Sequence, residues 1–249
     1  MINHGLTPQE IFFYRFLIAY LGIWVISPKR LFTNNWKDEL WLVAGGIFGG
    51  SLYFFTENTA LGITQASNVS FIICTAPLLT TILSLLFYKS EKASKGLIYG
   101  SLLALMGVGL IVFNGSFVLK ISPIGDLLTL LAALSWAFYS LIIKKMAGRY
   151  PTVFITRKIF FYGVLTILPA FLLHPLHPDT VVLLQPAVLF NLLFLAVLAS
   201  LICYVLWNVV LKQLGTVRAS NYIYLNPLVT MIASFLILDE KITLVALGG

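Results

Sequence analysis

Long apolar stretches separated by short polar gaps run through this chain. Eight of them are long enough to cross a bilayer, whose hydrocarbon core of about 30 Å takes roughly 20 helical residues. They cover residues 8–27, 39–61, 64–88, 96–113, 124–146, 151–173, 187–211 and 216–238, and a ninth begins near Thr243. The pattern predicts an all-α membrane protein with short connections and no inserted soluble domain.

The composition agrees with a lipid environment. Hydrophobic residues make up 59% of the 249 positions and charged residues only 10%, whereas soluble domains carry about 25% charged residues. The net charge of +7 does not indicate nucleic acid, because the basic residues lie in short gaps and form no continuous basic face. Cys74 and Cys203 both lie inside apolar stretches, so they predict neither a disulfide framework nor a metal site.

Two segments of the chain match each other, and each has a proline in the middle of an apolar stretch. The first contains Leu61-Gly62, Ala66-Ser67-Asn68 and Pro77, and the second contains Leu214-Gly215, Ala219-Ser220-Asn221 and Pro227. Paired, interrupted segments at matching places in two halves point to the binding site of a secondary transporter. The sequence therefore suggests a permease for a small-molecule substrate.

Positively charged residues gather in alternate gaps between the apolar stretches. These residues are Lys29, Arg30, Lys37, Lys89, Lys92, Lys95, Lys144, Lys145, Arg149, Lys212 and Arg218. The intervening gaps hold only Lys120 and Lys241. Because basic loops face the cytoplasm, we expect a multi-pass protein of the cytoplasmic (inner) membrane with Met1 outside.

The stretch that holds Pro77 and the stretch that holds Pro227 are five spans apart. Since five is an odd number, the two stretches run in opposite directions, as in the inverted repeats of secondary transporters. Two complete halves would need one helix before Met1 and the rest of the helix that begins near Thr243. We therefore expect a ten-helix plan of which this chain lacks the first helix and most of the last.

The order of several motifs resembles the EamA-like permeases of the drug/metabolite transporter (DMT) superfamily. The motifs are Pro8 with Arg15-Phe16 and Ala19, residues 52–61 followed by Thr64-Gln65-Ala66-Ser67-Asn68, Pro77 with Glu91, Gly125-Asp126-Leu127-Leu128 with Ser135-Trp136-Ala137, and Pro227 with Glu240. The resemblance implies two inverted five-helix halves, residues 1–116 and residues 122–249, around a central cavity. It also implies transport of metabolites, amino acids or drugs, with export in some members and suspected proton coupling in several.

Glu57 is the acidic residue placed deepest inside a predicted span. An ionisable group in a membrane helix is costly, so it is expected to face a cavity or a partner. A carboxyl group in such a place suits proton coupling. The alternative is that Glu57 lies close enough to the outer surface to stay hydrated, about 6 Å by helix rise. Both interpretations stay open.

Three cationic side chains also lie inside predicted spans. Arg15 is about two turns into the first stretch, where it could pair with Glu10, Glu57 or an anionic substrate. Arg157 and Lys158 follow Pro151 by six and seven residues. Long basic side chains near helix ends usually extend to the membrane interface, and this is the expectation for Arg157 and Lys158.

Polar and aromatic residues on the two proline stretches and their neighbours form a candidate substrate cavity. Together with Glu57, the candidate residues are Asn58, Asn68, Thr75, Pro77, Trp136, Tyr139, Trp207, Asn208, Asn221, Tyr224 and Pro227. A proline in a membrane helix frees a backbone carbonyl to accept a hydrogen bond. Helix packing and interfacial belts also use Trp, Tyr and Asn, so each residue alone has this second interpretation.

Other classes of protein fit less well. The three histidines, His4, His174 and His177, lie in predicted outside segments, and the chain carries no hydrolase, metalloprotease or nucleotide-binding signature. We therefore expect no enzyme activity, metal or cofactor. The alternative to a transporter is a non-transporting membrane sensor or assembly subunit. Closely spaced glycines at 45–50 predict tight helix packing within the bundle or in a homodimer.

Overall fold

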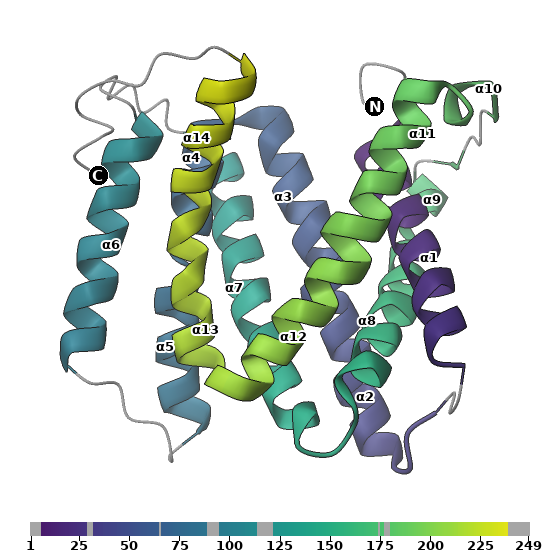
Figure 1. Cartoon of the computed structure of the whole chain (residues 1–249), viewed down its shortest axis with the longest axis horizontal. Helices are drawn as coiled ribbons and strands as arrows, with labels where there is room; N and C mark the ends of the chain where they lie inside the picture. Colours follow the sequence, from purple (N-terminus) through teal and green to yellow (C-terminus); the bar gives the residue numbers. More distant parts are fainter. Residues whose placement is uncertain are drawn as a thin grey trace. The chain divides into compact units, whose positions relative to one another are not determined.

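The computed structural model describes residues 6–28, 32–64, 66–88, 95–113, 122–173, 175–176 and 180–238 (Figure 1). Within these ranges every regular element is a helix. The elements are α1 (Pro8–Ile26), α2 (Trp36–Gly46), η2 (Ile47–Ser51), α3 (Leu52–Ile63), α4 (Ala66–Ile73), α5 (Ala76–Phe87), α6 (Lys95–Phe113), α7 (Pro123–Ala147), α8 (Thr152–Ile167), α9 (Ala170–Leu173), α10 (Thr180–Leu183), α11 (Pro186–Leu193), η3 (Phe194–Ile202), α12 (Cys203–Leu214), α13 (Thr216–Asn221), η4 (Tyr222–Tyr224) and α14 (Leu225–Leu238).

The predicted apolar stretches correspond to these helices. Among the described residues, five helical segments are long and apolar enough to span a membrane: Pro8–Ile26, Asn68–Phe87, Pro123–Ala147, Thr152–Leu172 and Pro186–Leu214. The prediction of an all-α membrane protein is therefore confirmed. The expected span near Thr243, together with Glu91 and Glu240, lies outside the described residues.

Helix ends follow local sequence signals. At the start of α1, the Thr7 side chain accepts a hydrogen bond from the Glu10 backbone N–H, and the Glu10 carboxylate accepts from the Thr7 backbone N–H at 2.8 Å. This reciprocal capping box satisfies donors that a helix start leaves unpaired. Between α12 and α13 the break is a single residue, Gly215, whose φ of 81° is favourable only for glycine.

The described chain divides into two contact units. Unit 1 comprises Met1–Phe55 and Phe138–Gln213, and unit 2 comprises Thr56–Ala137 and Leu214–Gly249. The divisions fall within α3 and α7 and at the end of α12. Each unit therefore draws residues from both predicted halves of the sequence.

Unit 1 is organised around α1 and α8. These two helices pack against each other, α1 also packs on η3, and α8 packs on α2 and η2. η2 and η3 are π-helical segments, each inside a longer, continuous helix. The ring of Phe16 lies 5.1 Å from that of Phe160 and 5.7 Å from that of Tyr204, which places an aromatic core between these helices.

Small residues permit this close packing in unit 1. A Cβ atom at Gly46 would lie 2.5 Å from Cβ of Tyr162, and one at Gly49 would lie 2.2 Å from Cδ2 of Tyr139. Both approaches are shorter than any van der Waals contact between carbon atoms. The predicted role of the 45–50 glycines in helix packing inside the bundle is confirmed, while a homodimer stays a prediction.

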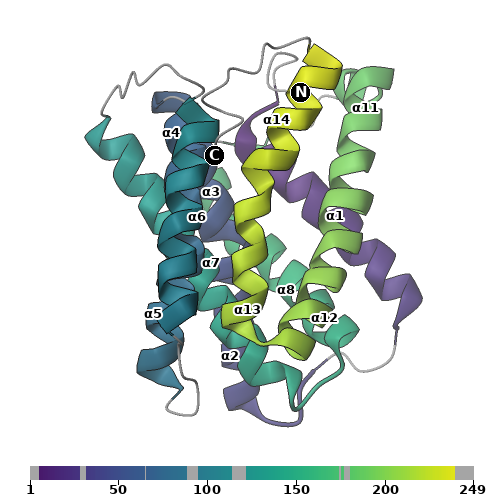
Figure 2. The ribbon, with the colours of Figure 1, turned by 60° about the vertical axis from the view of Figure 1, so that its left-hand side comes forward.

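Unit 2 contains a close contact between α5 and α13, which lie side by side in both views (Figures 1 and 2). α4 and α14 lie at the other end of this unit, so the two interrupted segments run antiparallel (Figures 1 and 2). The Oγ atom of Ser84 lies 3.3 Å from Oγ1 of Thr216, and both residues are fully buried. α6 packs on α4, α5, α14 and η4.

Candidate functional site

Both proline stretches are interrupted helices in unit 2. The first stops at Ile73, turns at Cys74 and Thr75, and resumes as α5 with Pro77 in its first turn. The second changes from α13 to the short 3-10 segment η4 and resumes as α14 just before Pro227. Proline has no N–H to donate and its ring clashes with the carbonyl four residues earlier. The predicted interruptions therefore occur in both segments.

Candidate residues of unit 2 lie on or next to these breaks. Asn68 and Pro77 are buried, whereas Thr75, Asn221 and Tyr224 are half-buried. The Ser101 hydroxyl of α6 donates to Oδ1 of Asn221 at 3.4 Å, and the Thr75 hydroxyl donates to the Ile72 carbonyl at 2.6 Å. Asn221 thus faces a neighbouring helix of its unit.

The remaining candidates of unit 2 are on α3, α7 and α14. Glu57 and Asn58 are half-buried in α3, Trp136 is half-buried in α7, and Pro227 is buried in α14. Glu57 precedes the end of α3 at Ile63 by six residues, which is about 9 Å along the helix axis. A role of this carboxyl group in proton coupling stays a prediction.

In unit 1 the structure brings two candidates into direct contact. The Tyr139 hydroxyl donates to Oδ1 of Asn208 at 2.7 Å, and Nδ2 of Asn208 donates to Oγ1 of Thr156 at 2.9 Å. All three residues are fully buried. Tyr204 donates to the Gly49 carbonyl of η2 at 2.6 Å. Trp207, the remaining candidate on α12, is half-buried.

Two residues near Asn208, Thr156 and Tyr204, were not predicted from the sequence. A signal was present for Tyr204, because it precedes Asn208 by four residues and so lies on the same face of the helix. Thr156 is on α8, 52 residues from Asn208 in sequence, and its contact depends on how α8 and α12 pack. Spacing along the chain does not reveal such a pairing.

Arg15 is held between α1 and η3. Its Nε donates to the Ser200 hydroxyl at 2.9 Å, and its guanidinium carbon lies 4.5 Å from the centre of the Phe54 ring. Ser200 is fully buried and Arg15 is half-buried. A cation over an aromatic face is stabilised by the ring quadrupole. This environment includes a hydroxyl acceptor and an aromatic surface.

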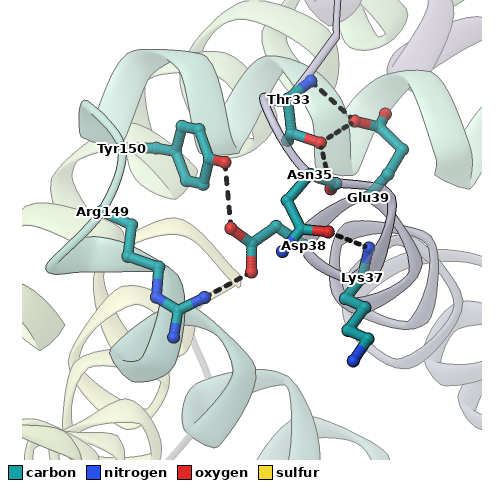
Figure 3. A network of polar contacts seen from close by, with 7 residues as sticks. All are labelled: Thr33, Asn35, Lys37, Asp38, Glu39, Arg149 and Tyr150. Atoms are coloured by element: carbon teal, nitrogen blue, oxygen red, sulfur yellow. Dashed lines mark hydrogen bonds and ion pairs between the residues drawn. The ribbon is translucent and has the colours of Figure 1, made fainter.

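A polar cluster closes the end of unit 1 where α1 and α7 end and α2 and α8 begin (Figure 3). Asp38 is buried and accepts from Nη1 of Arg149 at 2.6 Å and from the Tyr150 hydroxyl at 3.0 Å. Burial and the hydrogen bond to Asp38 raise the pKa of Tyr150 above its usual value, so this phenol remains a donor. Glu39 accepts from the Thr33 backbone N–H at 2.9 Å and from its hydroxyl at 2.7 Å.

Arg157 and Lys158 belong to the same end of unit 1. Lys158 forms an ion pair with Glu39, which also accepts from the Tyr162 hydroxyl, and Arg157 donates to the Ser27 carbonyl. Arg157 is 2% exposed and Lys158 is 3% exposed. The expectation that these two side chains extend to the membrane interface was therefore wrong. They are paired instead with Ser27, the residue that follows α1, and with Glu39 on α2, and protein packing covers them.

Comparison with known proteins gives the family. The EamA-like transporter family matches residues 1–113 and 123–249. An uncharacterized transporter of Archaeoglobus fulgidus is 30% identical, over 95% of this chain and 81% of that protein. A protein of Escherichia coli named as a probable amino-acid metabolite efflux pump is 23% identical, over 96% of this chain and 81% of that protein.

A solved crystal structure has the same fold. It superposes with a TM-score of 0.79 at 18% identity and covers 97% of this chain and 83% of its own. The chain belongs to the EamA-like transporter family. It is a multi-pass membrane transporter rather than an enzyme. Among the described residues, no group of three or more His, Cys, Asp or Glu side chains is placed to hold a metal ion.

Proposed function

We propose that this protein is a secondary transporter that moves small metabolites, with amino acids and amphipathic drugs as the leading substrate classes. Two relatives, from Escherichia coli and Salmonella typhimurium, are named as probable amino-acid metabolite efflux pumps. We also propose that residues 1–116 and 122–249 are inverted halves. The separate family matches to residues 1–113 and 123–249 support this division.

The observation that carries the proposal is the pair of interrupted helices in unit 2. Secondary transporters commonly bind substrates at discontinuous helices, whose breaks present backbone groups at mid-membrane depth. The breaks beside Pro77 and Pro227 lie in antiparallel segments of one unit (Figures 1 and 2). Asn68 and Asn221 occupy the same position of the matched Ala-Ser-Asn triplets. In this proposal the breaks and the candidate cavity residues contact the substrate.

Proton coupling by Glu57 is the second part of the proposal. A half-buried carboxyl group in a membrane helix can bind and release a proton as its surroundings change. Thr56 and Asn58, its neighbours in sequence, are polar as well. An exchange of one proton for one substrate molecule would link export to the proton gradient.

The test uses the protein reconstituted in liposomes that enclose a pH-sensitive dye. Proteinogenic amino acids and amphipathic drugs are added as a panel, and substrate uptake and proton flux are recorded for wild type, Glu57→Gln and Glu57→Asp. We expect substrate-dependent proton flux in wild type, its loss in Glu57→Gln, and partial retention in Glu57→Asp, which keeps the carboxyl group. Substrate movement without proton flux would refute the coupling. Failure of the whole panel would refute the substrate classes.

A further inference from the structure

We propose that unit 1 carries a binding site for an anionic phospholipid of the cytoplasmic leaflet. The site, here called the basic patch, consists of Lys37 and Trp41 on α2, Lys145 near the end of α7, and Arg149 just after that end. All four residues belong to unit 1. The inference goes beyond the proposed function, because it concerns the surrounding membrane and involves no transported compound.

The first step is a contact between the side chains of α2 and α7. The ammonium of Lys145 lies 3.7 Å from the centre of the Trp41 ring. A cation over an aromatic face is attracted by the ring quadrupole, and Trp gives the strongest attraction of the aromatic residues. This contact holds the Lys145 charge beside α2, while the Trp41 side chain itself is exposed.

The second step is the excess of positive charge around this contact. Lys37 precedes Trp41 by four residues and so lies on the same face of α2. Arg149 is held by its ion pair with the buried Asp38 at 2.6 Å, yet its side chain is 54% exposed (Figure 3). Asp38 balances one of the three positive charges. Within the described parts of the chain, no carboxylate forms an ion pair with Lys37 or Lys145, so the patch keeps a net positive charge.

The third step is the position of the patch relative to the membrane. Lys37 and Trp41 follow the first residue of α2 by one and five residues, and Lys145 precedes the last residue of α7 by two. Less than about 8 Å of helix axis therefore separates each residue from its helix end. The basic gaps that adjoin both helix ends are among those predicted to face the cytoplasm. On this orientation the charges lie at the level of the lipid head groups, where Trp side chains are also enriched.

The fourth step is the apolar surface beside the charges. Trp36 and Leu40, one turn apart on α2, are exposed, as is Trp41. A soluble anion would pair with the positive charges and leave these apolar side chains uncovered. A phospholipid uses both features, because its phosphate pairs with the cations while its glycerol and acyl chains cover the apolar side chains. Basic pockets on the cytoplasmic side of membrane helices bind anionic head groups, and the net positive charge favours an anionic lipid over a zwitterionic one.

The experiment measures lipid binding by the purified chain in an uncharged detergent. Phosphatidylglycerol and phosphatidylcholine with the same acyl chains are titrated separately. Bound lipids are counted by native mass spectrometry, and Tm is recorded with and without lipid. Wild type is compared with Lys37→Gln, Lys145→Gln, Lys145→Arg, Trp41→Phe and Trp41→Leu. Lys212→Gln is the matched control for loss of a positive charge, because Lys212 is exposed near the end of α12 on the same predicted side of the membrane.

We expect wild type to bind phosphatidylglycerol more tightly than phosphatidylcholine and to gain thermal stability from it. Lys37→Gln and Lys145→Gln should each weaken phosphatidylglycerol binding about fivefold, the factor expected for one basic residue near an anionic lipid surface. Lys145→Arg and Trp41→Phe should retain binding, because a cation over a ring remains, whereas Trp41→Leu should weaken it. Lys212→Gln should bind both lipids as wild type does.

Equal binding of the two lipids by wild type would overturn the proposal. A loss in Lys212→Gln as large as that in Lys145→Gln would also overturn it and would assign the selectivity to overall charge. Stabilisation by soluble glycerol 3-phosphate to the same extent as by phosphatidylglycerol would overturn the assignment to a lipid. Lys37→Gln, at an exposed position, keeps the test decisive if Lys145→Gln fails to fold. No transported compound enters these measurements, so their outcome is separate from that of the transport assay.

Discussion

The ion pair between Glu39 and Lys158 makes an asymmetric prediction about stability. Lys158 is 3% exposed and the Glu39 side chain is 18% exposed, so the ammonium cannot turn to solvent without opening the packing of unit 1, whereas the carboxylate is partly in contact with solvent. Removing one member of a buried pair is expensive, about 3–5 kcal/mol, when the remaining charge has no other partner. The two members of this pair differ in the partners that remain.

Glu39 has other hydrogen-bond donors besides Lys158, whereas Lys158 has few other polar partners among the described residues. After Lys158→Met, Glu39 still accepts two hydrogen bonds from Thr33 and one from Tyr162, so the loss should be about 2 kcal/mol, the value of one bond to a charged group. After Glu39→Gln, the Lys158 ammonium loses its counter-charge and, among the described residues, keeps a neutral amide oxygen and ring faces such as Phe32 at 4.5 Å. The loss should approach about 4 kcal/mol.

The assay is thermal unfolding of the detergent-solubilised protein. At about 2–4 °C per kcal/mol for a chain of this size, Glu39→Gln should lower Tm by about 10 °C and Lys158→Met by about half of that. The double variant should resemble Lys158→Met, because it leaves no unpaired charge. Lys37 lies at an exposed position of α2, the helix that carries Glu39. As a control, Lys37→Met should change Tm little. A larger effect of Lys158→Met, or additive losses in the double variant, would refute this reasoning.

Two further predictions concern helix packing. Gly49→Ala should destabilise the protein by about 1–3 kcal/mol in thermal unfolding, because the new Cβ would lie 2.2 Å from Cδ2 of the buried Tyr139 ring. Gly100→Ala should be neutral or slightly stabilising, because a Cβ there would have no atom of the described residues within 4 Å. Equal effects of the two substitutions would contradict the argument. Ser84→Cys with Thr216→Cys, in a background without Cys74 and Cys203, should form a disulfide on mild oxidation, since the two hydroxyls lie 3.3 Å apart. Transport should stop on oxidation and return on reduction if α5 and α13 separate during the cycle, and unchanged transport by the cross-linked protein would show that they do not.

The sequence predicts the fold well because lipid imposes a length on each span. Apolar stretches such as 8–27 and 96–113 match α1 and α6 to within one residue at each end. The match is close because a charged residue or a proline lies at most ends of the apolar stretches. The breaks beside Pro77 and Pro227 were also predictable, because proline has no N–H wherever it lies. These features depend only on neighbours in the chain.

Contacts between distant segments were less predictable. The sequence shows Arg157 and Lys158 near a helix start, where the membrane interface is the usual destination. Their partners, Ser27 and Glu39, are more than a hundred residues away, and only helix packing brings them close. Likewise, Tyr139 and Asn208 were identified as polar residues in spans, but their mutual hydrogen bond depends on the arrangement of α7 and α12.

The π-helical segments η2 and η3 change how the two longest helices present their side chains. Each π turn accommodates an extra residue, which rotates everything that follows by about 100° relative to an unbroken α-helix. A helical wheel drawn from Trp36 would therefore assign Glu57 to the wrong face, and one drawn from Pro186 would do the same for Asn208. Helical wheels used to interpret mutational scans of these helices should therefore be started again at Leu52 and at Cys203, the first residues after the π-helical segments.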